Sequence, residues 1–271
     1  NDFDLSRICG IASTSSTPAV IKVSGQYDNR ISIITAARHF HEKIGAILIV
    51  GGEKFGLISF DETGNYRNFK SNSSCAAGTG SFLDQQARRL NLSGIEELSR
   101  IAFNNKGVIP KIATRCAVFA KTDLVHAQQE GYSLEEICDG LCYGLAKNIV
   151  DTLMKDEQTN PPIIFTGGVS RIRAVARHIQ SIIGLNIISD KMSYLYGAIG
   201  AGLNLPDELN KLHRTDINSA DDIIIQMPLE NNHYYEPLTL TLSDYPDFSN
   251  DKYEYTAFGP EDMYPVEVDI Y

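Results

Sequence analysis

The chain has 271 residues, of which 43% are hydrophobic and 21% are charged, proportions typical of a globular protein with a buried core. Its formal net charge of −10 argues against nucleic acid as a partner, and it contains no apolar run long enough for a membrane span. Its five cysteines have the irregular spacing of reduced thiols, and its N-terminus lacks the pattern of a signal peptide. We therefore expect a cytoplasmic protein.

In chain order, the Ser- and Thr-rich residues 10–17 predict a loop, and residues 31–40 have the spacing of a helix. The apolar run 46–50 predicts a buried strand that ends in the turn Gly51-Gly52. Strands that alternate with helices favour an α/β layered domain. The other predicted elements are hairpin strands at 55–61 and 66–70, helices at 81–90, 95–104, 117–129, 134–154, 175–183 and 195–203, and strands at 163–166 and 185–188.

Residues 74–82, Ser-Cys-Ala-Ala-Gly-Thr-Gly-Ser-Phe, place a thiol just before a glycine turn that opens a helix. Such a turn lets backbone N–H groups approach a phosphate, and the helix N-terminus adds partial positive charge. The same field would lower the pKa of Cys75 and favour the thiolate, which is the form that binds metal. The loop therefore predicts both a nucleotide site and a metal or redox site.

A second cysteine, Cys116, stands at another predicted helix start, beside Arg115. Two thiolates in one chain cannot complete the four-thiolate shell of a [4Fe–4S] cluster, whereas two copies about a two-fold axis can. The alternative for Cys75 and Cys116 is burial as small apolar residues, which is also the interpretation that we favour for Cys138 and Cys142.

Four segments in this order carry a family resemblance: CAAGTGSFLDQQARRL, RCAVFAKTD, FTGGVSR and YGAIGAG. They resemble the activator ATPases of 2-hydroxyacyl-CoA dehydratases and benzoyl-CoA reductases, which belong to the superfamily of acetate kinase, sugar kinases, heat-shock chaperones and actin. The resemblance implies a ribonuclease-H-like, actin-like ATPase lobe. It also implies a homodimer in which Cys75 and Cys116 hold one [4Fe–4S] cluster between two subunits, and an acyl-CoA dehydratase or reductase as electron acceptor.

The resemblance also implies a site for ATP or ADP with Mg²⁺, between the turn at residues 78–80 and the turn at 167–168. Glu53, next to the phosphates, is the predicted catalytic residue, in a position to orient a water molecule. The predicted nucleotide-binding residues are Gly51, Gly52, Gly78, Thr79, Gly80, Gly167 and Gly168.

The sequence departs from the family pattern at the phosphate end. It has Glu53-Lys54 after the glycines, where the family usually carries Gln-Asp, and Ile49 where an acidic residue is expected. The first phosphate loop of the superfamily has no clear copy, and residues 13–17 are the nearest candidate. We therefore expect a partial module, with a partial N-terminal lobe at 1–45, an activator ATPase-like lobe at 46–205 and an acidic extension at 206–271.

Two other functions are left open by the sequence. One is a sugar or acyl kinase of the same superfamily, which would need a substrate-binding Asp and no cluster. The other is a non-catalytic lobe that binds a nucleotide or a partner. The extension holds fifteen Asp and Glu against three Lys and Arg, and its alternating residues 238–242 predict one strand.

Overall fold

The computed structural model describes residues 8–72, 79–113, 117–155, 159–206 and 220–225, and the backbone of residues 254–255 and 266–267. The chain divides into two compact units, Asn1–Gln226 and Met227–Tyr271. In the second unit, β8 (Glu254–Tyr255) pairs antiparallel with β9 (Val266–Glu267). Cys75, Gly78, Cys116 and the strand predicted at 238–242 lie outside the described residues. The domain boundaries predicted after residues 45 and 205 stay predictions.

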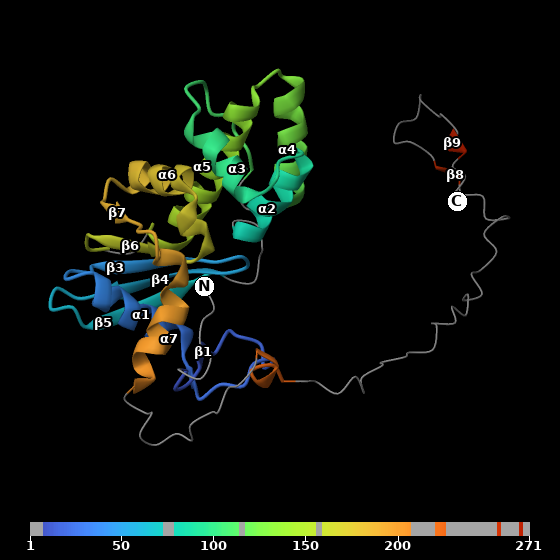
Figure 1. Ribbon diagram of the computed structural model, residues 1–271. Helices are drawn as coiled ribbons and strands as arrows, with labels where there is room; N and C mark the ends of the chain where they lie inside the picture. Colours follow the sequence, from blue (N-terminus) through green and yellow to red (C-terminus); the bar gives the residue numbers. More distant parts are fainter. Residues whose placement is uncertain are drawn as a thin grey trace. The chain divides into compact units, whose positions relative to one another are not determined.

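The first unit is built on a five-stranded sheet with the strand order β5-β4-β3-β6-β7 (Figure 1). The central strand β3 is apolar throughout, and it pairs antiparallel with β4 and parallel with β6. A strand covered on both faces needs apolar side chains in both directions, and this run provides them. The strands are β3 (Ala46–Val50), β4 (Phe55–Phe60), β5 (Tyr66–Ser71), β6 (Ile163–Thr166) and β7 (Ile187–Ile188).

Helices lie on both sides of the sheet, which confirms the predicted α/β layers: α2 to α6 on one side, α1 and α7 on the other (Figure 1). Successive residues of β3 point to opposite faces, so Leu48 joins the core under α5 and α6, and Ile47 joins the core under α1 and α7. The helices are α1 (Asn29–Phe40), α2 (Gly80–Arg89), α3 (Ile95–Phe103), α4 (Ala117–Gln129), α5 (Leu134–Leu153), α6 (Arg173–Ile183) and α7 (Tyr196–Asn204).

Local sequence signals explain how two of these helices are fixed. The predicted capping box opens α5: the Ser133 hydroxyl accepts the Glu136 N–H at 3.3 Å, and the Glu136 carboxylate accepts the Ser133 N–H at 2.8 Å. In α7, an added Cβ at Gly200 would overlap the carbonyl oxygen of Ser32 in α1. The backbones of α1 and α7 therefore touch, as the glycine-rich sequence of α7 predicts.

The N-terminal segment differs from the sequence prediction. Residues 10–17 are predicted as a loop, but β1 (Ala12–Thr14) pairs parallel with β2 (Gly25–Tyr27), and Ser13 and Thr14 are buried. The polar residues at these positions give no local signal for a strand. The strand is stabilised by contacts with α7, which lies far along the sequence. Nearby, the Lys22 N–H donates to the Ile223 carbonyl at 2.8 Å, so residues 220–225 pair with this segment.

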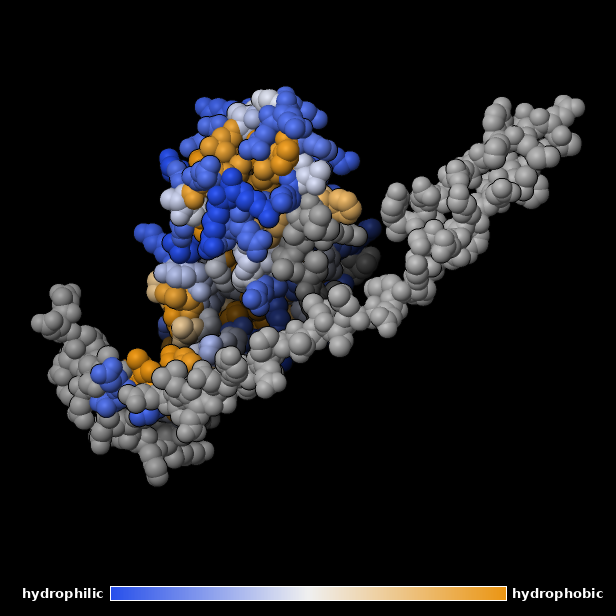
Figure 2. Space-filling model, turned by 90° about the vertical axis from the view of Figure 1, so that its right-hand side faces the viewer, coloured by the Kyte–Doolittle hydropathy of each residue, from blue (hydrophilic) through white to orange (hydrophobic). Residues whose placement is uncertain are grey.

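Apolar side chains are exposed on and before α4. Val108 and Phe119 are each 66% exposed, Val125 is 42% exposed and Ile109 is 37% exposed. Figure 2 views this side and shows apolar side chains gathered on the helical part of the molecule. In the part of the chain that the structure describes, no helix combines the length and the apolarity that crossing a membrane requires.

Candidate functional site at the carboxyl edge of the sheet

The parallel strands β3 and β6 end side by side at one edge of the sheet. Their register pairs Ile49 with Thr166, so the turn that begins at Gly51 and the turn that begins at Gly167 lie together. In open α/β sheets, ligands bind outside the carboxyl ends of the strands, where turns and helix starts surround a crevice. The structure therefore brings together two of the turns singled out from the sequence.

The turn after β6 requires glycine at its first position. Gly167 has φ 87° and ψ 172°, a backbone region that is essentially restricted to glycine. An added Cβ would overlap the carbonyl oxygen of Val50 and lie 2.8 Å from its carbonyl carbon. An added Cβ at Gly168, by contrast, would meet no atom within 4 Å. Gly167 thus lets the turn press against the end of β3, and Gly168 leaves open space in front of it.

The start of α2 is held against the turn after β3. The Gly80 N–H donates to the Gly51 carbonyl at 2.9 Å, and the Ser81 N–H donates to the Gly52 carbonyl at 2.9 Å. Thr79, the N-cap residue, is fully buried. The first two helical amides, which the sequence predicts as phosphate donors, are therefore paired with backbone carbonyls. Their role in this structure is to bring α2 close to the sheet edge.

Two cavities meet at this edge, and we name them by the element beside them. The α3-side cavity has a volume of about 330 Å³ and holds the charged side chains of the site. In it, the Arg171 guanidinium pairs with the Glu96 carboxylate at 3.1 Å and lies over the Tyr194 ring. Its lining residues are Gly51, Gly52, Gly80, Ser81, Asp84, Ile95, Glu96, Ser99, Gly168, Val169, Arg171 and Ile172.

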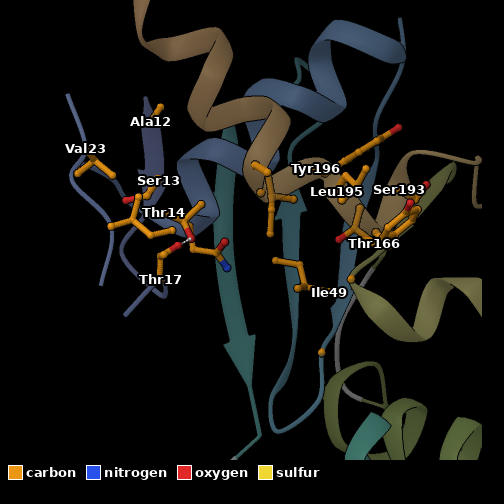
Figure 3. A pocket seen from close by; sticks show the side chains of 18 of the residues that line it. Ala12, Ser13, Thr14, Thr17, Val23, Ile49, Thr166, Ser193, Leu195 and Tyr196 are labelled. Atoms are coloured by element: carbon orange, nitrogen blue, oxygen red, sulfur yellow. Dashed lines mark hydrogen bonds between the residues drawn. The ribbon is translucent and has the colours of Figure 1, made fainter. Parts of the chain in front are cut away.

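The α7-side cavity has a volume of about 400 Å³ and lies between the N-terminal segment, the ends of β3 and β6, and the start of α7 (Figure 3). Ile49 reaches into it from β3, opposite Thr14 and Thr17. The described residues that line it are all uncharged: Ile11, Ala12, Ser13, Thr14, Thr17, Ile21, Val23, Asn29, Ile33, Ile49, Gly51, Thr166, Gly167, Ser193, Tyr194, Leu195, Tyr196, Gly197 and Ala198.

A hydrogen-bond network fixes the wall of the α7-side cavity at the start of α7. The Tyr196 hydroxyl donates to the Asp190 carboxylate and lies 2.8 Å from Nε2 of His41. Burial and the neighbouring Asp190 raise the pKa of Tyr196. In Figure 3 the Tyr196 ring points away from the cavity, so this network supports the cavity wall from behind.

The predicted site residues divide between the two cavities. Gly52, Gly80 and Gly168 line the α3-side cavity, Gly167 lines the α7-side cavity, and Gly51 lines both. Two other predicted site residues line neither cavity: Thr79 is buried, and Glu53 is exposed in the turn after β3. The catalytic role of Glu53 stays a prediction.

Sequence reasoning missed the charged side chains of the α3-side cavity. Arg171 stands directly after the quoted Gly-Gly-Val-Ser, so its position next to a glycine turn was a usable signal. Asp84 lies within the segment CAAGTGSFLDQQARRL, but nothing in that segment marked its side chain. Glu96 carried no signal, because it is one of two adjacent acids at the start of an amphipathic helix.

Two of the cysteines lie in the hydrophobic core. Cys138 and Cys142 lie on α5 and are fully buried, as predicted. Burial raises the pKa of Cys138 to about 12 and also raises that of Cys142, so both remain protonated thiols. Among the described residues, no group of three or more His, Cys, Asp or Glu side chains is arranged to hold a metal ion. Cys75 and Cys116 stay predicted ligands.

Comparison with known families identifies the chain. The model of the BadF/BadG/BcrA/BcrD ATPase family matches residues 20–204, more than half of the sequence. The chain belongs to the BadF/BadG/BcrA/BcrD ATPase family. A relative in this comparison, the 2-hydroxyisocaproyl-CoA dehydratase activator of Clostridioides difficile, is 32% identical over 162 residues, which are 60% of this chain and 60% of the activator.

Two further comparisons agree with membership of this ATPase family. One of the subunits of the benzoyl-CoA reductase of Thauera aromatica is 26% identical over 204 residues, which are 71% of this chain and 70% of the reductase polypeptide. The solved structure of the activator of the 2-hydroxyisocaproyl-CoA dehydratase from Clostridium difficile, with bound ADPNP, superimposes with a TM-score of 0.69 at 25% identity and covers 76% of both chains. The predicted actin-like ATPase fold is therefore confirmed.

Proposed function

We propose that this chain is the nucleotide-binding lobe of an ATP-dependent, iron–sulfur electron-transfer activator of a 2-hydroxyacyl-CoA dehydratase or a benzoyl-CoA reductase. One observation carries the proposal: in a chain of this ATPase family, glycine turns from three distant parts of the sequence line one cavity at the sheet edge. The match to the dehydratase activator covers 60% of that protein, so the activity and the partner enzyme are themselves part of the proposal.

The two cavities suit the two ends of an adenine nucleotide. In the α3-side cavity, the planar Arg171 guanidinium is able to stack on the base, and Glu96 and Ser99 offer hydrogen-bond partners for the ribose hydroxyls. Carboxylates repel phosphates, so the phosphates do not belong beside Glu96. Gly51 lines both cavities, and we therefore place the phosphates past this glycine, toward the α7-side cavity.

In this proposal, Cys75 and Cys116 hold a [4Fe–4S] cluster together with the same cysteines of a second subunit. A cluster bound in this way supplies one-electron transfer to the partner enzyme. Phe119 and Val125 are exposed apolar side chains on α4, the helix that begins directly after Cys116 in the sequence, and they support a protein contact at this helix.

A second candidate is a nucleotide-binding lobe without turnover. The uncharged lining of the α7-side cavity favours it, because phosphoryl transfer needs cationic groups or metal ions around the reacting phosphates. The two candidates share the same nucleotide site and differ in what happens to the phosphates.

The activator function is tested by measuring iron and sulfide in protein purified without oxygen. We expect about four iron and four sulfide ions for every two chains, with broad absorbance near ~400 nm. The Cys75→Ser and Cys116→Ser variants should lose the iron and keep the fold. Cys9→Ser is the matched control, because Cys9 is exposed and stands outside both motifs. Iron that survives both substitutions would contradict the proposed ligands.

A further inference from the structure

The α7-side cavity offers a test of whether this chain fits the Mg²⁺ that an ATPase family implies. Magnesium takes oxygen ligands in octahedral geometry and is held in nucleotide sites through one or two carboxylates. Among the residues that the structure describes, every one that lines this cavity is uncharged, and Ile49 projects into it from the end of β3 (Figure 3). The described residues therefore do not fit a magnesium ion on the side of the sheet where the proposed function places the phosphates.

The carboxylates near the sheet edge do not make up for this. Asp84 and Glu96 line the α3-side cavity, where they pair with Arg88 at 2.8 Å and with Arg171 at 3.1 Å. Glu53 is exposed in the turn after β3 and lines neither cavity. No Lys or Arg side chain is found among the described residues that line the α7-side cavity, so each added phosphate charge enters an uncharged environment there.

We infer that this chain binds adenine nucleotides without coordinating Mg²⁺ and without cleaving them, so that the bound nucleotide acts through occupancy alone. This inference rests on the proposed nucleotide site. It adds that the affinity does not rise with the number of phosphates, since the cavity gives their charge no compensation. A full activator would then obtain its metal-binding carboxylates from outside the residues described here.

The first experiment is calorimetric titration of the chain with AMP, ADP and ATP, each in Mg²⁺ and in EDTA. We expect affinities in Mg²⁺ and EDTA that agree within about twofold, ATP bound no more tightly than AMP, and no release of phosphate from ATP. An affinity for ATP with Mg²⁺ about tenfold or more above that for AMP would overturn the inference, as would phosphate release. If none of the three nucleotides binds, the proposed function fails and the inference falls with it.

A gain-of-function variant places the missing carboxylate in the cavity. Ile49→Asp should bind ATP about tenfold more tightly with Mg²⁺ than with EDTA, whereas Ile49→Asn, which is equally polar and uncharged, should show no metal dependence. If Ile49→Asp impairs folding, the same test is made on the opposite wall of the cavity with Thr17→Asp and its control Thr17→Asn. If neither folded Asp variant gains metal dependence, the phosphates lie elsewhere and the inference is wrong.

Discussion

Replacing Gly167 by alanine should destabilise the whole first unit, because this residue joins the two strands that form the site. The φ of 87° and ψ of 172° cost a non-glycine residue about 1–3 kcal/mol. The added Cβ would also overlap the carbonyl oxygen of Val50, and relief requires the ends of β3 and β6 to separate, at about 1–3 kcal/mol more. We therefore expect a loss of about 2–6 kcal/mol, a large part of the roughly 5–15 kcal/mol that holds a domain folded.

Urea unfolding followed by circular dichroism measures this loss as a lower midpoint with an unchanged slope. Gly168→Ala is the matched control, because its added methyl group meets no atom within 4 Å and should leave stability within about 0.5 kcal/mol. If Gly167→Ala and Gly168→Ala unfold at the same urea concentration, the strained turn described here is wrong.

The remaining predictions concern stability and thiol chemistry. Gly200→Ala should lower the free energy of unfolding by about 1–3 kcal/mol, because its methyl group forces α7 away from Ser32; an unchanged urea midpoint would refute the close contact. Asp139→Asn should cost about 3 kcal/mol or more, because it leaves buried His178 without its anionic partner. Burial opposes ionisation of Asp139, but hydrogen bonds from His178 and Asn105 lower its pKa overall. Its contribution is therefore complete above the unfolded pKa of about 3.9 and is lost as pH falls through the lower folded value, so the stability difference between wild type and Asp139→Asn should begin to shrink below about pH 4 and close only beneath the folded pKa. Cys138, whose pKa is raised to about 12, should resist thiol reagents at pH 8 in the native protein; fast labelling there would contradict its burial.

The elements of the sheet and its helices could be predicted because their signals are local. Residues 46–50 are all apolar, so this strand presents apolar side chains to both faces of the sheet. The Ser133 capping box marks the start of a long helix. The strand β1 could not be predicted, because polar Ser13 and Thr14 are buried by the nearby strand β2 and by α7, which lies far away in the sequence. Contacts of this kind carry no local pattern.

The site could be predicted only in part, for the same reason. The glycine turns at residues 51–52, 80 and 167–168 were visible as motifs, and the fold brings them to one edge. The second cavity was not visible, since its walls come from residues 11–33, 49–51, 166–167 and 193–198 and share no motif. That none of the described side chains lining the cavity is charged becomes evident only when they are assembled, because Lys22, Asp28 and Arg30 lie in the same stretch of sequence and do not line it. Ile49, residues 13–17 and the segment YGAIGAG were each noted in the sequence, but nothing local indicated that they line one cavity.

The central claim, that a nucleotide occupies the carboxyl edge of the sheet, is tested most directly by amide hydrogen exchange with and without ADP. The account predicts slower exchange in peptides that cover residues 50–54, 80–84 and 168–172, where the turns and helix starts surround the α3-side cavity. The turn at residues 61–65, which lies at the far end of β4, serves as the internal control and should not change. Protection confined to other segments, or none at saturating ADP, would contradict the account.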